Sequence, residues 1–218
     1  MKTFFKTFLC VFVCFLCFFT FSCKSLEEDV SSSISETRDD FYYAKTDDYL
    51  VTFTSGKREQ NYVMDGVSTS LVPYGVIVLK TSKNLGKTPS FAIKSGDKVY
   101  SGEMEINPFD GSFVADIERE IKGEDDIIFS LPSQNFETKL KNLSKNWEIT
   151  PSKALDIFVK HKKNELNKYK KSNLDGEIYM KIVGDEENNT YYFVLFVGKD
   201  GNTISSLIDV NSGEILQS

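Results

Sequence analysis

The sequence predicts an α+β protein in which a β-rich antiparallel sandwich or barrel-like domain precedes a unit of one helix and three antiparallel strands. Residues 47–147 predict the first part, because short alternating apolar segments are separated by turns rich in Gly, Pro, Asn and Asp. Residues 149–218 predict the second, because a helical apolar period gives way there to three further alternating segments. We therefore expect a domain boundary near residue 148.

The N-terminal segment has the features of a secretory signal peptide over residues 1–22. Lys2 and Lys6 precede an apolar run over 8–21, and Ser22 and Cys23 follow it. The run is shorter than the roughly 20 residues that span a bilayer. This arrangement resembles the signal peptide of bacterial lipoproteins, which is cut before a cysteine that becomes lipid-modified.

The resemblance implies lipid attachment (diacylglycerol, palmitate) at Cys23. It also implies a place at the cell membrane or outer membrane, with the protein exposed to the periplasm or the cell exterior. Thr20 and Phe21 depart from the commoner Leu-Ala/Ser pattern before the cysteine. A secreted product and an uncleaved, membrane-anchored product therefore stay open as alternatives.

The charge of the chain argues against nucleic acid as a partner. The leader holds two of the 26 basic residues and none of the 32 acidic ones, so the part after residue 22 has a formal charge of −8. An acidic surface without a basic cluster disfavours nucleic acid and anionic lipid surfaces. All four cysteines lie at or before Cys23. We therefore expect no disulfide and no cysteine metal site in the mature domain.

Residues 23–46 are rich in Ser and acidic residues, and they show neither a helical nor a strand period. Such a segment buries too little apolar surface to offset its ordering entropy. We expect an acidic, flexible tether here, serving as a spacer or as a tail without function.

The middle region alternates between short strands and turns. Strands are expected over 48–54, 74–80, 91–94, 99–106, 112–117 and 127–129. Trp147 is the only tryptophan and lies near the expected domain boundary. We expect its indole to be buried where the two parts meet.

The C-terminal unit should open with a helix. Thr150 is a good cap and Pro151 suits the first helical position. Apolar residues recur at helical spacing as far as about residue 171, namely Leu155, Phe158, Val159, Leu166 and Tyr169. Strands are expected over 177–183, 191–197 and 203–210, and a last turn leads into 214–216.

This ending is similar to that of PepSY-type domains, whose units commonly close with a valine–aspartate strand, a glycine turn and a Glu-x-Leu tail. The residues that carry the likeness are Ile208, Asp209, Val210, Asn211, Ser212, Gly213, Glu214, Ile215 and Leu216. The likeness covers about 65 residues, from the helix onward. It implies inhibition of peptidases or binding of envelope proteins, and it brings no catalytic residues.

The residues needed for several kinds of catalysis are missing. His161 is the only histidine, which excludes a histidine-pair zinc site. It is expected on the surface of the lysine-rich helix, so a Ser-His-Asp triad is nearly excluded as well. No nucleophile elbow, P-loop or dinucleotide fingerprint occurs. A Ser–Lys dyad or a carboxylate pair stays open, because these residues are plentiful and pair only in space. We expect no cofactor and no metal.

Three functions are then compared. The first is a non-catalytic, lipid-anchored envelope protein that binds a peptidase or another envelope protein. The alternative is a small-molecule or glycan-binding envelope lipoprotein, which predicts a concave apolar pocket lined by Tyr and Phe in the β-rich domain. A hydrolase is the third, and it needs a cleft with paired catalytic groups.

Overall fold

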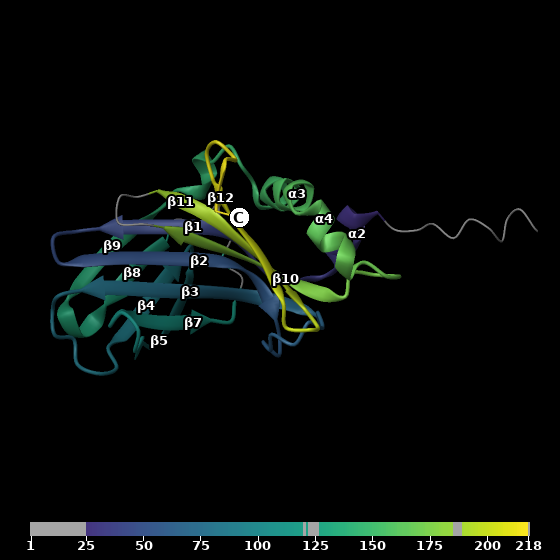
Figure 1. The fold of residues 1–218 in the computed structure, drawn as a ribbon. Helices are drawn as coiled ribbons and strands as arrows, with labels where there is room; N and C mark the ends of the chain where they lie inside the picture. Colours follow the sequence, from purple (N-terminus) through teal and green to yellow (C-terminus); the bar gives the residue numbers. More distant parts are fainter. Residues whose placement is uncertain (1–24, 120, 122–126, 185–188, 218) are drawn as a thin grey trace, which may run out of the picture.

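The computed structural model of the chain describes residues 25–119, 121, 127–184 and 189–217. The molecule is rich in β structure, and its mostly antiparallel sheet curls into a nearly closed, barrel-like body (Figure 1). The helices labelled α2, α3 and α4 lie together at one end of the sheet (Figure 1).

The barrel-like body contains the strands of the middle region. One run of the sheet has the order β1 (Ile34–Lys45), β2 (Tyr49–Glu59), β3 (Leu71–Thr81), β7 (Phe113–Ile117) and β6 (Glu105–Ile106). The other run has the order β5 (Lys98–Glu103), β4 (Ser90–Ser95), β8 (Ile127–Leu131) and β9 (Phe136–Asn142). β9 pairs with both β8 and β1, which closes one side. On the other side, no ladder between described residues joins β7 to β5.

Alternate residues of these strands fill the interior, as the period of two in a strand requires. Val51, Phe53, Ile77, Leu79 and Phe129 are fully buried there. Their neighbours in sequence face the opposite side of the sheet. The barrel interior is therefore a packed core, and any cleft must lie on the outer face of these strands.

The C-terminal strands extend the same sheet. β10 (Gly176–Gly184), β11 (Thr190–Gly198), β12 (Thr203–Asp209) and β13 (Ile215–Gln217) form an antiparallel meander. One face carries a second core, which includes Phe158, Val194 and Phe196. Three helices cover that core: α2 (Leu26–Ser32), α3 (Pro151–His161) and α4 (Lys163–Leu166). The short 3-10 helices lie in connecting segments and are η1 (Pro132–Gln134), η2 (Ser144–Asn146) and η3 (Asn167–Tyr169).

β1 belongs to both parts of the molecule. Its first residues pair in parallel with β10, with Ile34 opposite Ile178. Its last residues pair with β9, with Tyr42 opposite Asn142. The register against β2 shifts at Asp39, between these two stretches. Such a bulge bends a strand locally, and here it stands where β1 exchanges one neighbour for the other.

The expectation of a flexible tether over 23–46 is wrong for residues 25–46. Ser25 caps α2, and its hydroxyl and the Glu28 carboxylate form a reciprocal capping box. Leu26 and Val30 are buried in the second core. β1 then occupies most of the remaining segment. Polar composition misled the prediction, because several polar residues of this segment are buried with partners that are distant in sequence.

The strands predicted from alternating apolar segments are present in the structure, and the predicted helix is present in part. β2, β3, β4, β5, β7, β8, β10, β11 and β12 each overlap an expected strand. The Thr150 hydroxyl accepts a hydrogen bond from the Lys153 N–H at 3.3 Å, and Pro151 opens α3. α3 ends at His161, because the chain turns at Lys162 before α4. β9 was not predicted.

The C-terminal 208–216 segment forms a tight turn between β12 and β13. The Asp209 carboxylate accepts hydrogen bonds from the N–H groups of Asn211 and Ser212 at 2.9 and 2.7 Å. These bonds hold the pKa of Asp209 below its usual value. Gly213 has a φ of 74°, which favours glycine. The aspartate and the glycine of this ending thus have local structural roles.

Candidate functional site

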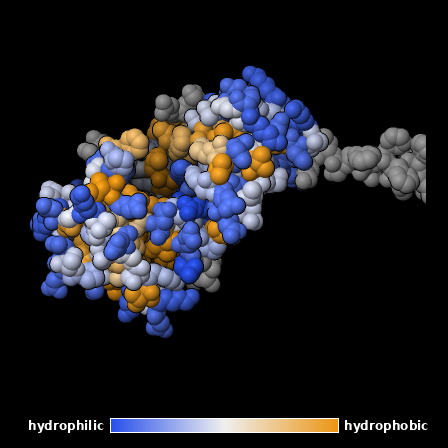
Figure 2. Space-filling model, turned by 90° about the horizontal axis from the view of Figure 1, so that it is seen from below, coloured by the Kyte–Doolittle hydropathy of each residue, from blue (hydrophilic) through white to orange (hydrophobic). Residues whose placement is uncertain are grey.

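A cleft of about 900 Å³ lies on the outer face of β1, β2, β3 and β7 and is bounded by β10 and β11. Figure 2 shows a hollowed face of the molecule, with hydrophobic side chains inside the hollow. The lining residues share the outward side of these strands or lie at its rim. They are Glu36, Arg38, Phe41, Tyr43, Lys45, Leu50, Thr52, Thr54, Arg58, Tyr62, Tyr74, Val76, Val78, Lys80, Val114, Asp116, Leu143, Lys181, Ile182, Gly184, Asn189 and Thr190.

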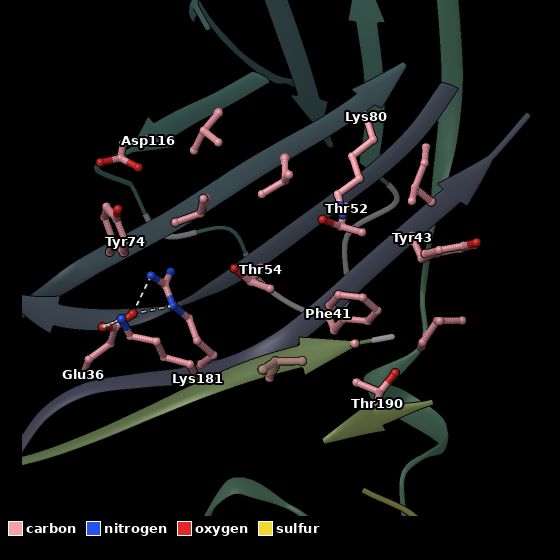
Figure 3. A pocket seen from close by; sticks show the side chains of 18 of the residues that line it. Glu36, Phe41, Tyr43, Thr52, Thr54, Tyr74, Lys80, Asp116, Lys181 and Thr190 are labelled. Atoms are coloured by element: carbon pink, nitrogen blue, oxygen red, sulfur yellow. Dashed lines mark hydrogen bonds and ion pairs between the residues drawn. The ribbon is translucent and has the colours of Figure 1, made fainter. Parts of the chain in front are cut away.

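The strand register arranges the floor of the cleft in cross-strand rows. The first row places Glu36 beside Arg58. The second places Arg38 and Tyr74 on either side of Gly56. The three remaining rows are Phe41–Thr54–Val76–Asp116, Tyr43–Thr52–Val78–Val114 and Lys45–Leu50–Lys80. The cleft thus has a charged end, a largely apolar middle that also holds two threonines, and a second end with two lysines. Figure 3 labels Glu36 and Lys181 at the first end and Lys80 at the second.

Glu36 is the centre of the charged end. Arg38 donates to its Oε1 atom through Nε at 2.8 Å and Nη2 at 2.6 Å. The Tyr62 hydroxyl donates to Oε2 at 2.7 Å, and the Lys181 ammonium lies 3.7 Å from the same atom. Burial, together with the Glu36 carboxylate, raises the pKa of Tyr62. One carboxylate is therefore held by two cations and a phenol from three separate strands or loops.

Tyr74 lies against both arginines of the cleft. The guanidinium carbon of Arg58 is 3.4 Å from its ring centroid, and that of Arg38 is 4.4 Å away. Gly56 separates Arg38 from Tyr74 in the register and has no side chain between them. A Cβ at Gly56 would overlap the Thr37 carbonyl oxygen. Burial and then the Asp116 carboxylate raise the pKa of Tyr74 to about 12, so Tyr74 stays a neutral phenol at physiological pH.

Arg38 has one donor left over. Its side chain is buried, yet its Nη1 atom has no hydrogen-bond partner among the described residues. A buried donor without a partner costs about 1–3 kcal/mol. The other two nitrogens of this guanidinium are paired with Glu36, so Nη1 is the one guanidinium nitrogen of Arg38 without a partner among the described residues.

The lining is basic although the protein is acidic. Five basic and two acidic side chains line the cleft, a formal charge of +3, whereas the whole chain carries −6. The chain has three arginines, and two of them line the cleft. Exposed carboxylates outside the lining partly offset this charge. Glu118 lies 3.6 Å from Arg58, and Asp110 lies 3.9 Å from Lys80. Exposed pairs of this kind are weak.

A second buried polar cluster anchors the loop between β2 and β3 next to the cleft. The Ser35 hydroxyl lies 3.0 Å from Glu59 Oε1 and 2.9 Å from Glu177 Oε2. The Gly66 N–H donates to Glu177 Oε1 at 2.6 Å, and the Thr69 N–H donates to Glu59. All three anchoring side chains are almost completely buried. This cluster holds the loop that carries Tyr62 into the cleft.

Trp147 contacts both parts of the molecule, although its indole is less buried than expected. Its ring stacks on Phe41, which lines the cleft, and lies edge-on to Tyr192 in the second core. Its side chain is half-buried. The other residue singled out in the sequence, His161, is exposed at the end of α3 and is not among the lining residues. Cys23 lies outside the described residues.

Sequence reasoning missed the charged end of the cleft. Glu36 and Arg38 stand in the segment that was expected to be a tether, and Lys181 lies about 140 residues further on. A capping box at Ser25 and Glu28 was the one local signal that structure begins there. The outward-facing positions of Thr52 and Thr54 were readable from the strand period, but their partners were not. Arg58 lay beyond the strand expected over 48–54, whereas β2 continues to Glu59.

Comparison of the chain with protein-family models, with curated proteins and with solved structures finds no match. Within the part of the chain that the structure describes, no helix is long and apolar enough to cross a membrane. Over the same residues, no group of three or more His, Cys, Asp or Glu side chains is placed to hold a metal ion.

Proposed function

We propose that this protein is an exported envelope protein, anchored by a lipid on Cys23, that binds a small molecule in the cleft without chemical turnover. The observation that carries the proposal is the cleft itself. It is within the size range of ligand pockets, it is lined by Phe41, Tyr43, Tyr62 and Tyr74, and a buried arginine at one end has a spare donor. Apolar walls with a few convergent polar groups are typical of binding sites.

The proposed site differs in place from the one that the sequence suggested. The ligand-binding hypothesis placed the pocket in the β-rich domain alone. The cleft instead takes residues from both parts, since Lys181 and Thr190 come from β10 and β11. We therefore propose that the C-terminal unit, with its PepSY-like ending, forms one wall of the ligand site.

A non-catalytic role is proposed for two reasons. His161 is the only histidine of the chain and stands apart from the cleft lining. The hydroxyl groups that line the cleft belong to threonines and tyrosines, and both Tyr62 and Tyr74 have a raised pKa. A raised pKa disfavours the ionised form that a nucleophile or base needs.

The experiment for this proposal fills the cleft and asks whether a bound molecule is lost. Thr54 lies in the middle row of the floor, so Thr54→Phe places a ring in the cleft. The matched control is Thr203→Phe, at an exposed position of β12. Native mass spectrometry of the protein purified from cell membranes should detect a bound small molecule in the wild type and in Thr203→Phe. We expect the small molecule to be absent from Thr54→Phe. If both variants retain it equally, the cleft is not the binding site.

A second candidate is a protein-binding module that engages a peptidase or another envelope protein. The loop between β2 and β3 favours it, because Val63, Met64 and Val67 are each about half exposed there. Crosslinking in intact cells tests this candidate. Replacing the three residues by Ser, Gln and Thr should abolish a wild-type crosslink to a protein partner, and an unchanged crosslink would reject this loop as the contact.

A further inference from the structure

We propose that the cleft binds an anionic amphiphile, which is a molecule with one carboxylate or phosphate head group and an extended apolar tail. This inference rests on the proposed ligand-binding function and adds the chemical class of the ligand. It follows from the order of the rows along the floor. Charged residues occupy one end, and apolar residues continue from it along the same strands.

The head group would lie at the Arg38 end. Glu36 is a single negative charge, but Arg38 and Lys181 both pair with it. This leaves one positive charge in excess around a buried carboxylate. The Nη1 atom of Arg38 also lacks an acceptor. A carboxylate or phosphate at this end of the cleft supplies the missing charge, and a planar guanidinium suits both groups.

Arg58 adds a second donor group beside the first. Its ion pair with Asp116 is long, at 3.6 Å, and its other partner is the exposed Glu118. The ring of Tyr74 holds this guanidinium in place at 3.4 Å. Arg58 is therefore positioned at the charged end without being tightly paired, so it is available to a head group.

The tail would lie on the next two rows of the floor. Phe41, Val76, Val78 and Val114 form this surface, and Leu143 and Ile182 stand at its rim. From Tyr74 to Val78 the strand advances about 13 Å, at roughly 3.3 Å per residue. The apolar surface is thus elongated and begins directly beside the arginines, as an amphiphile requires.

The same contacts disfavour a glycan. Sugars commonly stack on a free aromatic face, but two guanidinium groups already cover the ring of Tyr74. The Tyr62 hydroxyl is engaged by Glu36. Thr52, Thr54 and Tyr43 then supply the remaining hydroxyl groups of the middle rows, among apolar neighbours. A neutral polyhydroxylated ligand would leave most of its hydroxyl groups without partners.

Four probes with the same apolar chain test the inference: dodecanoate, dodecyl phosphate, dodecanol and dodecyltrimethylammonium. The processed, membrane-anchored protein is exchanged into phosphatidylcholine nanodiscs, and Trp147 fluorescence is followed during titration. Empty nanodiscs and Thr54→Phe correct for partitioning into lipid. We expect saturable binding of one or both acidic probes, about tenfold to a hundredfold tighter than dodecanol. The tighter acid identifies the head group as carboxylate or phosphate.

Charge variants locate the head group. Arg58→Gln should weaken binding of the acidic probe about tenfold and leave dodecanol unchanged. Lys181→Gln, at a more exposed side chain, should act in the same direction and serves if Arg58→Gln is poorly folded. Arg119→Gln and Lys94→Gln are the matched controls at exposed positions outside the lining.

The outcomes separate this inference from the proposed function. Equal binding of the acid and the alcohol, or preference for the cationic probe, would overturn the ligand class while leaving a functional cleft. Failure of all four probes, with a small molecule still retained by wild type and lost from Thr54→Phe in native mass spectrometry, would also overturn only the class. Failure in both experiments would overturn the cleft as a binding site.

Discussion

The ring of Trp147 stacks on the ring of Phe41, with centroids 6.0 Å apart and an interplanar angle of 26°. Phe41 belongs to β1 and the cleft floor, whereas Trp147 also lies edge-on to Tyr192 of β11. The single tryptophan therefore joins the cleft to the second core. The surroundings of the Trp147 ring therefore depend on both the cleft and the second core.

Trp147→Ala should lower the free energy of unfolding by about 2–4 kcal/mol, because it removes a half-buried ring from two aromatic contacts. Urea unfolding followed by circular dichroism measures the change. Trp147→Phe keeps an aromatic ring and should cost less. A loss of the same size in both variants would mean that the stacking on Phe41 and Tyr192 contributes nothing beyond the size of the indole.

Ser35→Ala should destabilise the protein by about 1–3 kcal/mol, because the hydroxyl stands between the buried carboxylates of Glu59 and Glu177. A hydroxyl carries one hydrogen, so Ser35 donates to one carboxylate at a time. Ser101→Ala, at an exposed site on β5, is the matched control. Unfolding midpoints that agree between the two variants would contradict this role.

Gly66→Ala should be more harmful than Gly86→Ala, although both glycines have a φ near 80°. A Cβ at Gly66 would lie 2.8 Å from the Lys199 Cγ and 2.9 Å from its Cα. At Gly86 nothing lies within 4 Å. Gly86→Ala should cost about 1 kcal/mol for its backbone conformation alone, and Gly66→Ala about 1–2 kcal/mol more. Thermal unfolding of the pair measures the difference, and equal costs would exclude a close contact with Lys199.

Alkaline pH should destabilise the fold through Tyr74. The pKa of Tyr74 is raised to about 12 in the folded state, against about 10 in an unfolded chain. A raised folded pKa gives stability that is present below pH 10 and is lost as the pH rises toward 12. Tyr74→Phe should make the unfolding free energy fall less steeply over this range. A constant offset between variant and wild type from pH 8 to 12 would show that Tyr74 does not titrate as described.

Cys23→Ala tests the proposed anchor. Metabolic labelling with a radioactive fatty acid should mark the wild-type protein and not the variant, because the sulfur is the proposed attachment point. The variant should also accumulate unprocessed or be released from membranes. Labelling of Cys23→Ala at the wild-type level would disprove lipid attachment at this residue.

Apolar alternation made most of the strands predictable from the sequence. Val51 and Phe53 on one face, with Thr52 and Thr54 on the other, already define which side of β2 enters the core. Thr150 and Pro151 likewise mark the start of α3. In these segments the local pattern and the tertiary structure agree, so a single sequence suffices.

β1 was not predictable, because its polar residues are buried with partners that are distant in sequence. Ser35 lies against Glu177, which is 142 residues away, and Glu36 pairs with Lys181 across the parallel ladder to β10. Composition alone predicts disorder for such a segment. The cleft depends on the same ladder, so its charged end was hidden for the same reason.

The capping of α2 by Ser25 changes the distance between the protein body and its proposed anchor. Only Lys24 separates the cap from Cys23. Two residues reach at most about 7 Å, whereas a flexible tether of some 20 residues would extend roughly 25 Å. With a lipid on Cys23, the folded body would rest directly on the head groups of the membrane.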